Sequence, residues 1–206
     1  MTIRVLADDR QWKELTGMNT GLPWHRCADE KDFRQETGAD AFFNLLPTAG
    51  KMDYSFTAKP VFIHLITETL KEIGGLKNVL RINAWNGFLD RSIWEIAGSM
   101  NDESRLVLST LNKKVAEVDD EPGLIAARVI AMIVNEAYYA LQDGISTKAE
   151  IDTAMKLGTN YPHGPFEWSN TIGLRNILEL LDALAVVDKR YQASELLRTE
   201  AESIHS

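Results

Sequence analysis

An apolar run from Leu124 to Leu141 constrains this chain more than any other stretch. Only Arg128, Asn135 and Glu136 interrupt the run with strongly polar side chains. A helix that is apolar on nearly all sides has to be covered on most of them. The run is about as long as a short membrane span, but its polar interruptions and the polar helices after it favour a core or interface helix.

The ends of this helix and one of its faces can be read from the sequence. A Pro-Gly pair at 122–123 indicates the start, and an Asp-Gly pair at 143–144 indicates the end. Arg128 and Asn135 are seven residues apart, so they share a face two turns from each other.

A second helix is expected directly after the first. Thr147 and Glu150 form a capping-box pattern at its start, and Gly158 is expected to end it. The apolar residues between them follow an amphipathic spacing, namely Ile151, Ala154 and Met155. The turn-rich stretch at 160–168, NYPHGPFEW, then leads into a third helical region.

The first part of the chain predicts an α/β fold. Short β-branched or apolar runs alternate with stretches of helical pattern, which favours a parallel sheet. The expected strands are 3–7, 23–28, 41–46, 61–66, 78–83 and 115–118, and the expected helices are 9–15, 31–36, 67–73, 92–100 and 103–112. The predicted domains are 1–119 and 120–206, one α/β and one all-helical.

The helical half resembles the C-terminal domain of 3-hydroxyacyl-CoA dehydrogenases. The similarity runs in order through several motifs, which stand at 122–128 (PGLIAAR), 135–137 (NEA), 143–144 (DG), 151–158 (IDTAMKLG), 162–167 (PHGPFE) and 190–197 (RYQASELL). The resemblance implies an α/β plus all-α protein: a small, degenerate Rossmann-like domain followed by a helical domain. In that family the helical domain forms a homodimer contact and helps enclose acyl-CoA. The motifs themselves mostly encode helix packing, caps and turns.

The sequence departs from the family where NAD should bind. A dinucleotide fold needs glycines at the first strand-to-helix turn, so that the pyrophosphate can approach the backbone. This chain has no G-x-G-x-x-G, and Asp8 and Asp9 would place negative charge where the pyrophosphate should lie. Asp29 stands where a ribose-binding acid is expected, but a helix cap is the simpler interpretation. NAD binding in the usual mode is therefore not expected, and no cofactor is predicted.

The family's catalytic histidine is also replaced. The resemblance places Asn83 at its position, and Glu95, twelve residues later, at the position of the glutamate that holds the histidine. Asn86 keeps the family's identity, and Ala127 replaces a family asparagine. An amide cannot act as a general base, but it can bind a carbonyl or hydroxyl. Glu95 is thus the candidate catalytic residue, with a helix-surface role as its alternative. Asn83 and Asn86 are the candidate substrate-binding residues.

Few other residues are candidates for a catalytic or metal-binding role. His64, at the end of an expected strand, is a candidate substitute base, although a core or edge role is the simpler interpretation. His25 and His163 have no partner at metal-ligand spacing, so no metal site is expected. No motif for a hydrolase or nucleotidase is present.

Composition limits the partners. The net charge of −8 disfavours nucleic acid and anionic membranes. A single cysteine, Cys27, and an N-terminus without a long apolar run predict a cytoplasmic protein.

The sequence supports three hypotheses for the function. The first is a homodimer through the C-terminal helices that holds acyl-CoA or another small ligand without the usual activity. The second is an active 3-hydroxyacyl-CoA oxidoreductase with a rearranged site, and the third is a subunit that lends its helices to another chain.

Overall fold

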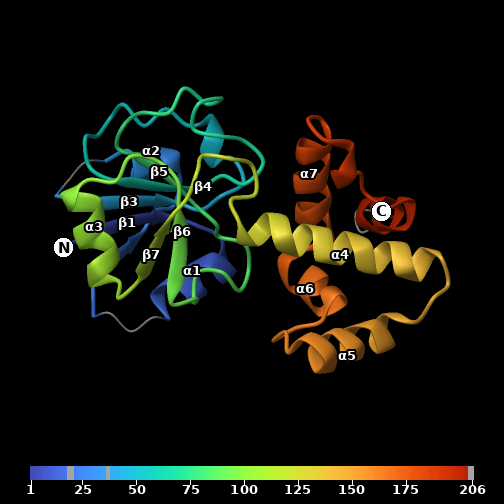
Figure 1. Cartoon of the computed structure of the whole chain (residues 1–206). Coiled ribbons are helices and arrows are strands. Elements are labelled where there is room, and N and C mark those ends of the chain that lie inside the picture. Colours follow the sequence, from blue (N-terminus) through green and yellow to red (C-terminus); the bar gives the residue numbers. More distant parts are fainter. Residues whose placement is uncertain (18–20, 36–37, 204–206) are drawn as a thin grey trace. The chain divides into compact units, whose positions relative to one another are not determined.

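The computed structural model describes residues 1–17, 21–35 and 38–203, and it divides the chain into two compact units (Figure 1). Met1–Leu124 form a mixed α/β unit, and Ile125–Ser206 form a helical unit. The predicted α/β plus all-α class is confirmed.

The α/β unit is built on a five-stranded parallel sheet in the order β2-β1-β3-β4-β5. Its strands are β1 (Ile3–Leu6), β2 (Trp24–Arg26), β3 (Ala41–Asn44), β4 (Val61–His64) and β5 (Val79–Ile82). A second, two-stranded parallel sheet contains β6 (Ile93–Ile96) and β7 (Lys114–Glu117). An antiparallel bridge between Arg81 and Ala97 joins the two sheets.

Apolar side chains cover both faces of the larger sheet, as buried parallel strands require. On one face, Leu15 of α1 (Asp9–Thr16) and Val107 of α3 (Asp102–Thr110) pack against the strands. On the other face, Phe33 of α2 (Glu30–Phe33) and Ala49 of η1 (Ala49–Lys51) do so. Asp29 caps α2 by accepting a hydrogen bond from the Asp32 N–H, which confirms its interpretation as a helix cap.

Two expected helices of this unit are wrong. Within 92–100 the structure has strand β6, because Trp94 and Ile96 are buried while Ile93 is 53% exposed. This alternation has the two-residue period of a strand. Residues 67–73 form turns, since the N–H groups of Leu70 and Lys71 bond to Asp120 rather than to helical carbonyl groups.

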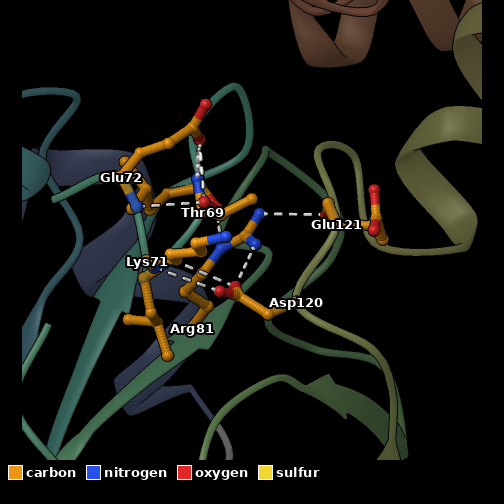
Figure 2. A network of polar contacts seen from close by, with 8 residues as sticks. Thr69, Lys71, Glu72, Arg81, Asp120 and Glu121 are labelled. Atoms are coloured by element: carbon orange, nitrogen blue, oxygen red, sulfur yellow. Dashed lines mark hydrogen bonds and ion pairs between the residues drawn. The ribbon is translucent and has the colours of Figure 1, made fainter. Parts of the chain in front are cut away.

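Arg81 is fully buried on β5 and joins three segments of the α/β unit (Figure 2). Its Nε donates to the Leu65 carbonyl oxygen at 2.9 Å, and its two terminal nitrogens donate to Asp120 at 2.6 Å and to the Glu121 carbonyl oxygen at 3.2 Å. Burial lowers the pKa of Arg81, and the Asp120 carboxylate opposes this effect. Residues 120–124 therefore belong to the α/β unit, although the sequence places its end at 119.

The helical unit is organised around α4 (Ala126–Gln142), which packs against α6, α7 and α8. The remaining helices are α5 (Lys148–Thr159), α6 (Pro165–Ile172), α7 (Leu174–Ala185), η2 (Lys189–Tyr191) and α8 (Glu195–Ser203). The predicted capping box of Thr147 and Glu150 opens α5. Asn160, in the left-handed conformation, ends it in place of Gly158.

The family motifs of this unit hold helices together. The Asn135 amide donates to the Gln192 carbonyl oxygen and accepts from the Ser194 N–H, while the Arg128 guanidinium lies over the Tyr191 ring. The shared face expected for Arg128 and Asn135 therefore contacts the single segment 191–194.

The PHGPFE motif is built around a glycine with no room for a side chain. Asp152 Oδ1 accepts from the Phe166 N–H at 2.8 Å, and a Cβ at Gly164 would lie 2.2 Å from that same oxygen. Glu167 closes the turn by accepting from the Gly164 N–H.

In the described part of the chain, no helix is sufficiently long and apolar to cross a bilayer.

The Arg81 network predicts a large effect of a small change. Asp120→Asn removes the charge that compensates a fully buried guanidinium, so we expect the free energy of unfolding to fall by about 3 kcal/mol in urea denaturation. Asp119→Asn, which changes an exposed neighbouring carboxylate, is the control and should change the free energy of unfolding by less than about 0.5 kcal/mol. Equal effects of the two substitutions would contradict the role of Asp120 in compensating the charge of Arg81.

Candidate functional site

The candidate site is the edge of the α/β unit at which the parallel strands end. In open parallel sheets, ligands bind at the carboxyl ends of the strands, where the strand order reverses. Here the order reverses at β1, because β2 lies on one side of it and β3 on the other. Asp8 follows β1, Leu45 follows β3, His64 ends β4 and Asn83 follows β5.

The amino end of α1 is closed by the chain itself. Asp8 Oδ1 accepts from the Gln11 N–H at 2.8 Å, and the Asp8 N–H donates to Gln11 Oε1 at 3.1 Å. A helix N-terminus attracts phosphate through free N–H groups and its positive dipole. The Asp8 carboxylate accepts from one of these N–H groups, that of Gln11, and its negative charge opposes the positive end of the dipole.

Gln11 also extends from α1 over the neighbouring strand ends. Its buried side-chain amide donates to the Leu45 carbonyl oxygen at 2.6 Å and to the Ala84 carbonyl oxygen at 3.4 Å. One turn further along α1, Glu14 accepts from the Gly87 N–H at 2.7 Å. Burial raises the pKa of Glu14, although backbone hydrogen bonds from Gly87 and Leu89 oppose the shift. Side chains of α1 thus bond the backbone around the turn where the family's glycine loop would be expected.

Asn83 has one unused hydrogen-bonding group. The residue is 9% exposed, and its Oδ1 accepts from the Trp85 N–H at 3.0 Å. This bond fixes which side-chain atom is the oxygen, and Nδ2 then has no partner among the described residues. An unpaired buried donor costs about 1–3 kcal/mol, so such a group requires an explanation. A ligand oxygen that accepts from Nδ2 would supply one.

Asn83 and Glu95 lie on neighbouring segments that a single bridge joins. The antiparallel bridge pairs Arg81, two residues before Asn83, with Ala97, two residues after Glu95. Glu95 lies on strand β6 rather than on the helix surface that the sequence suggested. Its charge raises the pKa of Arg91, against the larger lowering effect of burial on that guanidinium. The two positions that the family resemblance singles out therefore each lie two residues from this bridge.

His64 and Asn86 lie near the same edge. His64 pairs with Ile82 in the β4–β5 register, and its Nδ1 accepts from the Ala84 N–H at 3.1 Å. Burial lowers the pKa of His64 to about 4, so the ring is neutral at neutral pH and its Nδ1 lone pair is engaged. Both properties make it a poor general base. Asn86 lies in the turn after β5, half-buried, one residue before the Gly87 N–H that bonds Glu14.

The capping pair at α1 was missed in the sequence, although its signal was present. Aspartate followed three residues later by glutamine is a capping-box pattern. Asp8 and Asp9 were considered only as charges opposed to a pyrophosphate. In the structure Asp8 is the cap itself, and Asp9 forms an exposed ion pair with Arg26.

Comparison with known proteins assigns the helical half of the chain. Residues 123–205 match the family model described as 3-hydroxyacyl-CoA dehydrogenase, C-terminal domain. The helical unit belongs to the 3-hydroxyacyl-CoA dehydrogenase family. The 3-hydroxyadipyl-CoA dehydrogenase of Escherichia coli (strain K12) is 44% identical over 96 residues, which are 46% of this chain and 20% of that protein. The 3-hydroxybutyryl-CoA dehydrogenase of Bradyrhizobium diazoefficiens is 36% identical over 98 residues, 47% of this chain and 33% of that protein. The chain thus spans about a fifth to a third of these relatives' lengths.

Solved structures extend the fold similarity to both units. FadB2 of M. tuberculosis aligns with 98% of this chain and 93% of its own, with a TM-score of 0.81 at 12% identity. The (S)-3-hydroxybutyryl-CoA dehydrogenase PaaH1 of Ralstonia eutropha aligns over the same shares with a TM-score of 0.75 at 15% identity. These identities show a shared fold only. The α/β unit is accordingly a Rossmann-like domain of the kind found in 3-hydroxyacyl-CoA dehydrogenases.

The environment of His64 predicts a pH effect on stability. The unfolded chain binds a proton at the ordinary histidine pKa near 6.5, whereas the folded chain resists protonation until about pH 4. The free energy of unfolding should therefore fall as the pH decreases from about 6.5 towards 4. In His64→Asn, whose amide oxygen can still accept from the Ala84 N–H, this part of the pH dependence should be absent. Urea denaturation at several pH values measures it, and an unchanged slope in the variant would contradict the assignment.

Proposed function

We propose that this protein is a 3-hydroxyacyl-CoA dehydrogenase-like protein without the usual NAD-dependent activity, which dimerises and holds an acyl-CoA or a similar small ligand. The observation that carries the proposal is the capped amino end of α1, where the Asp8 carboxylate accepts from the Gln11 N–H and places negative charge where a pyrophosphate would be expected. Asn83 adds support, because its amide can bind a ligand oxygen but cannot remove a proton.

The ligand part of the proposal follows from the unused Asn83 Nδ2–H. Two side-chain acceptors at this edge of the sheet are already engaged: Gln11 Oε1 by the Asp8 N–H, and Asn83 Oδ1 by the Trp85 N–H. A carbonyl oxygen, which only accepts, suits such a site better than a hydroxyl group, which must also donate. A short 3-oxoacyl-CoA such as acetoacetyl-CoA is therefore the first ligand to test.

An active oxidoreductase with a rearranged site is the alternative. It draws support from the bridge between Arg81 and Ala97, since Asn83 and Glu95 each lie two residues from it. This alternative requires turnover of 3-hydroxybutyryl-CoA with NAD, lost in Glu95→Gln or His64→Ala. The engaged Nδ1 and low pKa of His64 favour Glu95 as the base in that case.

Self-association is proposed through the helical unit. No side chain of α5 is buried, although the helix carries Leu157, which is 83% exposed. On α4, Val129 is 51% exposed within an otherwise largely buried helix. Exposed apolar side chains on helices favour a covering partner, and a second copy is the simplest one.

We place the protein in the cytoplasm, which the free thiol of its only cysteine supports.

Acyl-CoA binding should depend on the Asn83 donor. We expect the wild-type protein to bind acetoacetyl-CoA in calorimetric titration and Asn83→Asp to bind it about tenfold more weakly, because a hydrogen bond is lost and a carboxylate faces the carbonyl. Asn112→Asp introduces the same charge at an exposed position and should keep wild-type affinity. Absence of binding by the wild type, or equal losses in both variants, would contradict the ligand proposal.

Dimerisation should depend on the exposed helix side chains. Light scattering should give twice the chain mass at micromolar concentration, and Leu157→Glu should give the chain mass, because a charge would be buried in the interface. Val187→Glu, at a residue that is 91% exposed in the turn after α7, should remain dimeric. A monomeric wild-type protein would refute self-association.

A further inference from the structure

Three side chains of different ligand types gather beside the edge strand β2. His25, Cys27 and Asp32 each offer one ligand atom, and these atoms all lie within 4.8 Å of one another. His25 Nε2 and Asp32 Oδ1 are 3.5 Å apart. His25 and Cys27 are two residues apart along an extended segment, so their side chains point to the same face. Asp32 comes from α2, the helix that follows β2.

These atoms fit the preferences of zinc. Zn²⁺ binds histidine nitrogen, cysteine sulfur and carboxylate oxygen at about 2.0–2.3 Å in a tetrahedral arrangement, which sets neighbouring ligand atoms roughly 3.3–3.8 Å apart. The distance between His25 Nε2 and Asp32 Oδ1 already lies in this range. The His25 side chain is 49% exposed, so its ring can adjust towards the sulfur without repacking the core.

A buried arginine supplies an independent observation at the same place. Arg4 is 5% exposed, and a terminal nitrogen of its guanidinium donates to Asp32 Oδ1. Its Nε has no hydrogen-bond partner among the described residues. Burial raises the pKa of the Cys27 thiol, and the charge of Arg4 opposes this effect. A neutral thiol is a weak acceptor, whereas a metal-bound thiolate accepts N–H hydrogen bonds readily. Metal binding at Cys27 would therefore create an acceptor for the unpaired Arg4 Nε–H.

The charges at the cluster are compatible with a divalent ion despite Arg4. The Cys27 thiolate and the Asp32 carboxylate together balance the two charges of Zn²⁺. They also lie beside the guanidinium and reduce its repulsion of the ion. The proton of Cys27 leaves to solvent when the metal binds, so affinity should weaken as the pH falls.

We propose that His25, Cys27 and Asp32 form a Zn²⁺ site that ties the edge strand β2 to α2, with water as the remaining ligand. This site goes beyond the proposed acyl-CoA function and does not depend on it. The sequence predicts no metal site, because His25 has no partner at metal-ligand spacing. The informative pattern was His-x-Cys at 25–27 followed by an acid at the start of the next helix.

Cobalt substitution tests the site directly. Co²⁺ bound to a thiolate gives a charge-transfer absorption band in the near ultraviolet, and Cys27 is the only cysteine in the chain. We expect the band to saturate at one Co²⁺ per chain, to be removed by one equivalent of Zn²⁺, and to weaken as the pH falls. Binding of Zn²⁺ should also raise the thermal midpoint of the protein.

Matched variants separate this site from incidental binding at the surface. Cys27→Ser should abolish the band and weaken Zn²⁺ binding at least tenfold in a competition assay with a chromogenic chelator. His163→Ala is the control, because His163 is also 49% exposed beside a carboxylate but belongs to a different unit, and it should bind as the wild type does. Circular dichroism of each variant verifies folding. Absence of the cobalt band, or Zn²⁺ binding that Cys27→Ser leaves unchanged, would overturn the proposal.

Discussion

The buried charge of Arg81 is the interaction on which the α/β unit most depends. A guanidinium without solvent has to be matched by acceptors, and here these come from the end of β4, from Asp120 and from the Glu121 backbone (Figure 2). Asp120 in turn accepts the N–H groups of Leu70 and Lys71. One charge therefore fixes the turn after β4, strand β5 and the segment that precedes the helical unit.

The candidate site combines an inherited framework with altered chemistry. The order of the parallel strands is compatible with a dehydrogenase-like fold. The groups on that framework perform other tasks: Asp8 caps α1, and Gln11 bonds the ends of neighbouring strands. These contacts hold the start of α1 and the ends of neighbouring strands together. They are the basis of our proposal that the fold persists without the usual NAD chemistry.

The sequence predicted the helical unit well because its signals are local. The capping box at Thr147 and the face shared by Arg128 and Asn135 depend on spacing along one helix. The sequence predicts a helix at strand β6 because a run of four residues fits both the helical and the strand period. Only the burial of Trp94 identifies the segment as a strand. The unpaired Asn83 amide and the cluster around Cys27 depend on contacts between distant segments. Sequence spacing alone could not reveal them.

The central claim is that side chains of this protein occupy the place of the dinucleotide. Titration of the wild-type protein with NADH, followed by nicotinamide fluorescence, tests this claim most directly, because binding is measured whether or not any reaction occurs. The account predicts no saturable signal up to millimolar NADH. Saturable binding of one NADH per chain would contradict it, since the pyrophosphate would then have displaced Asp8 and Gln11 from the amino end of α1.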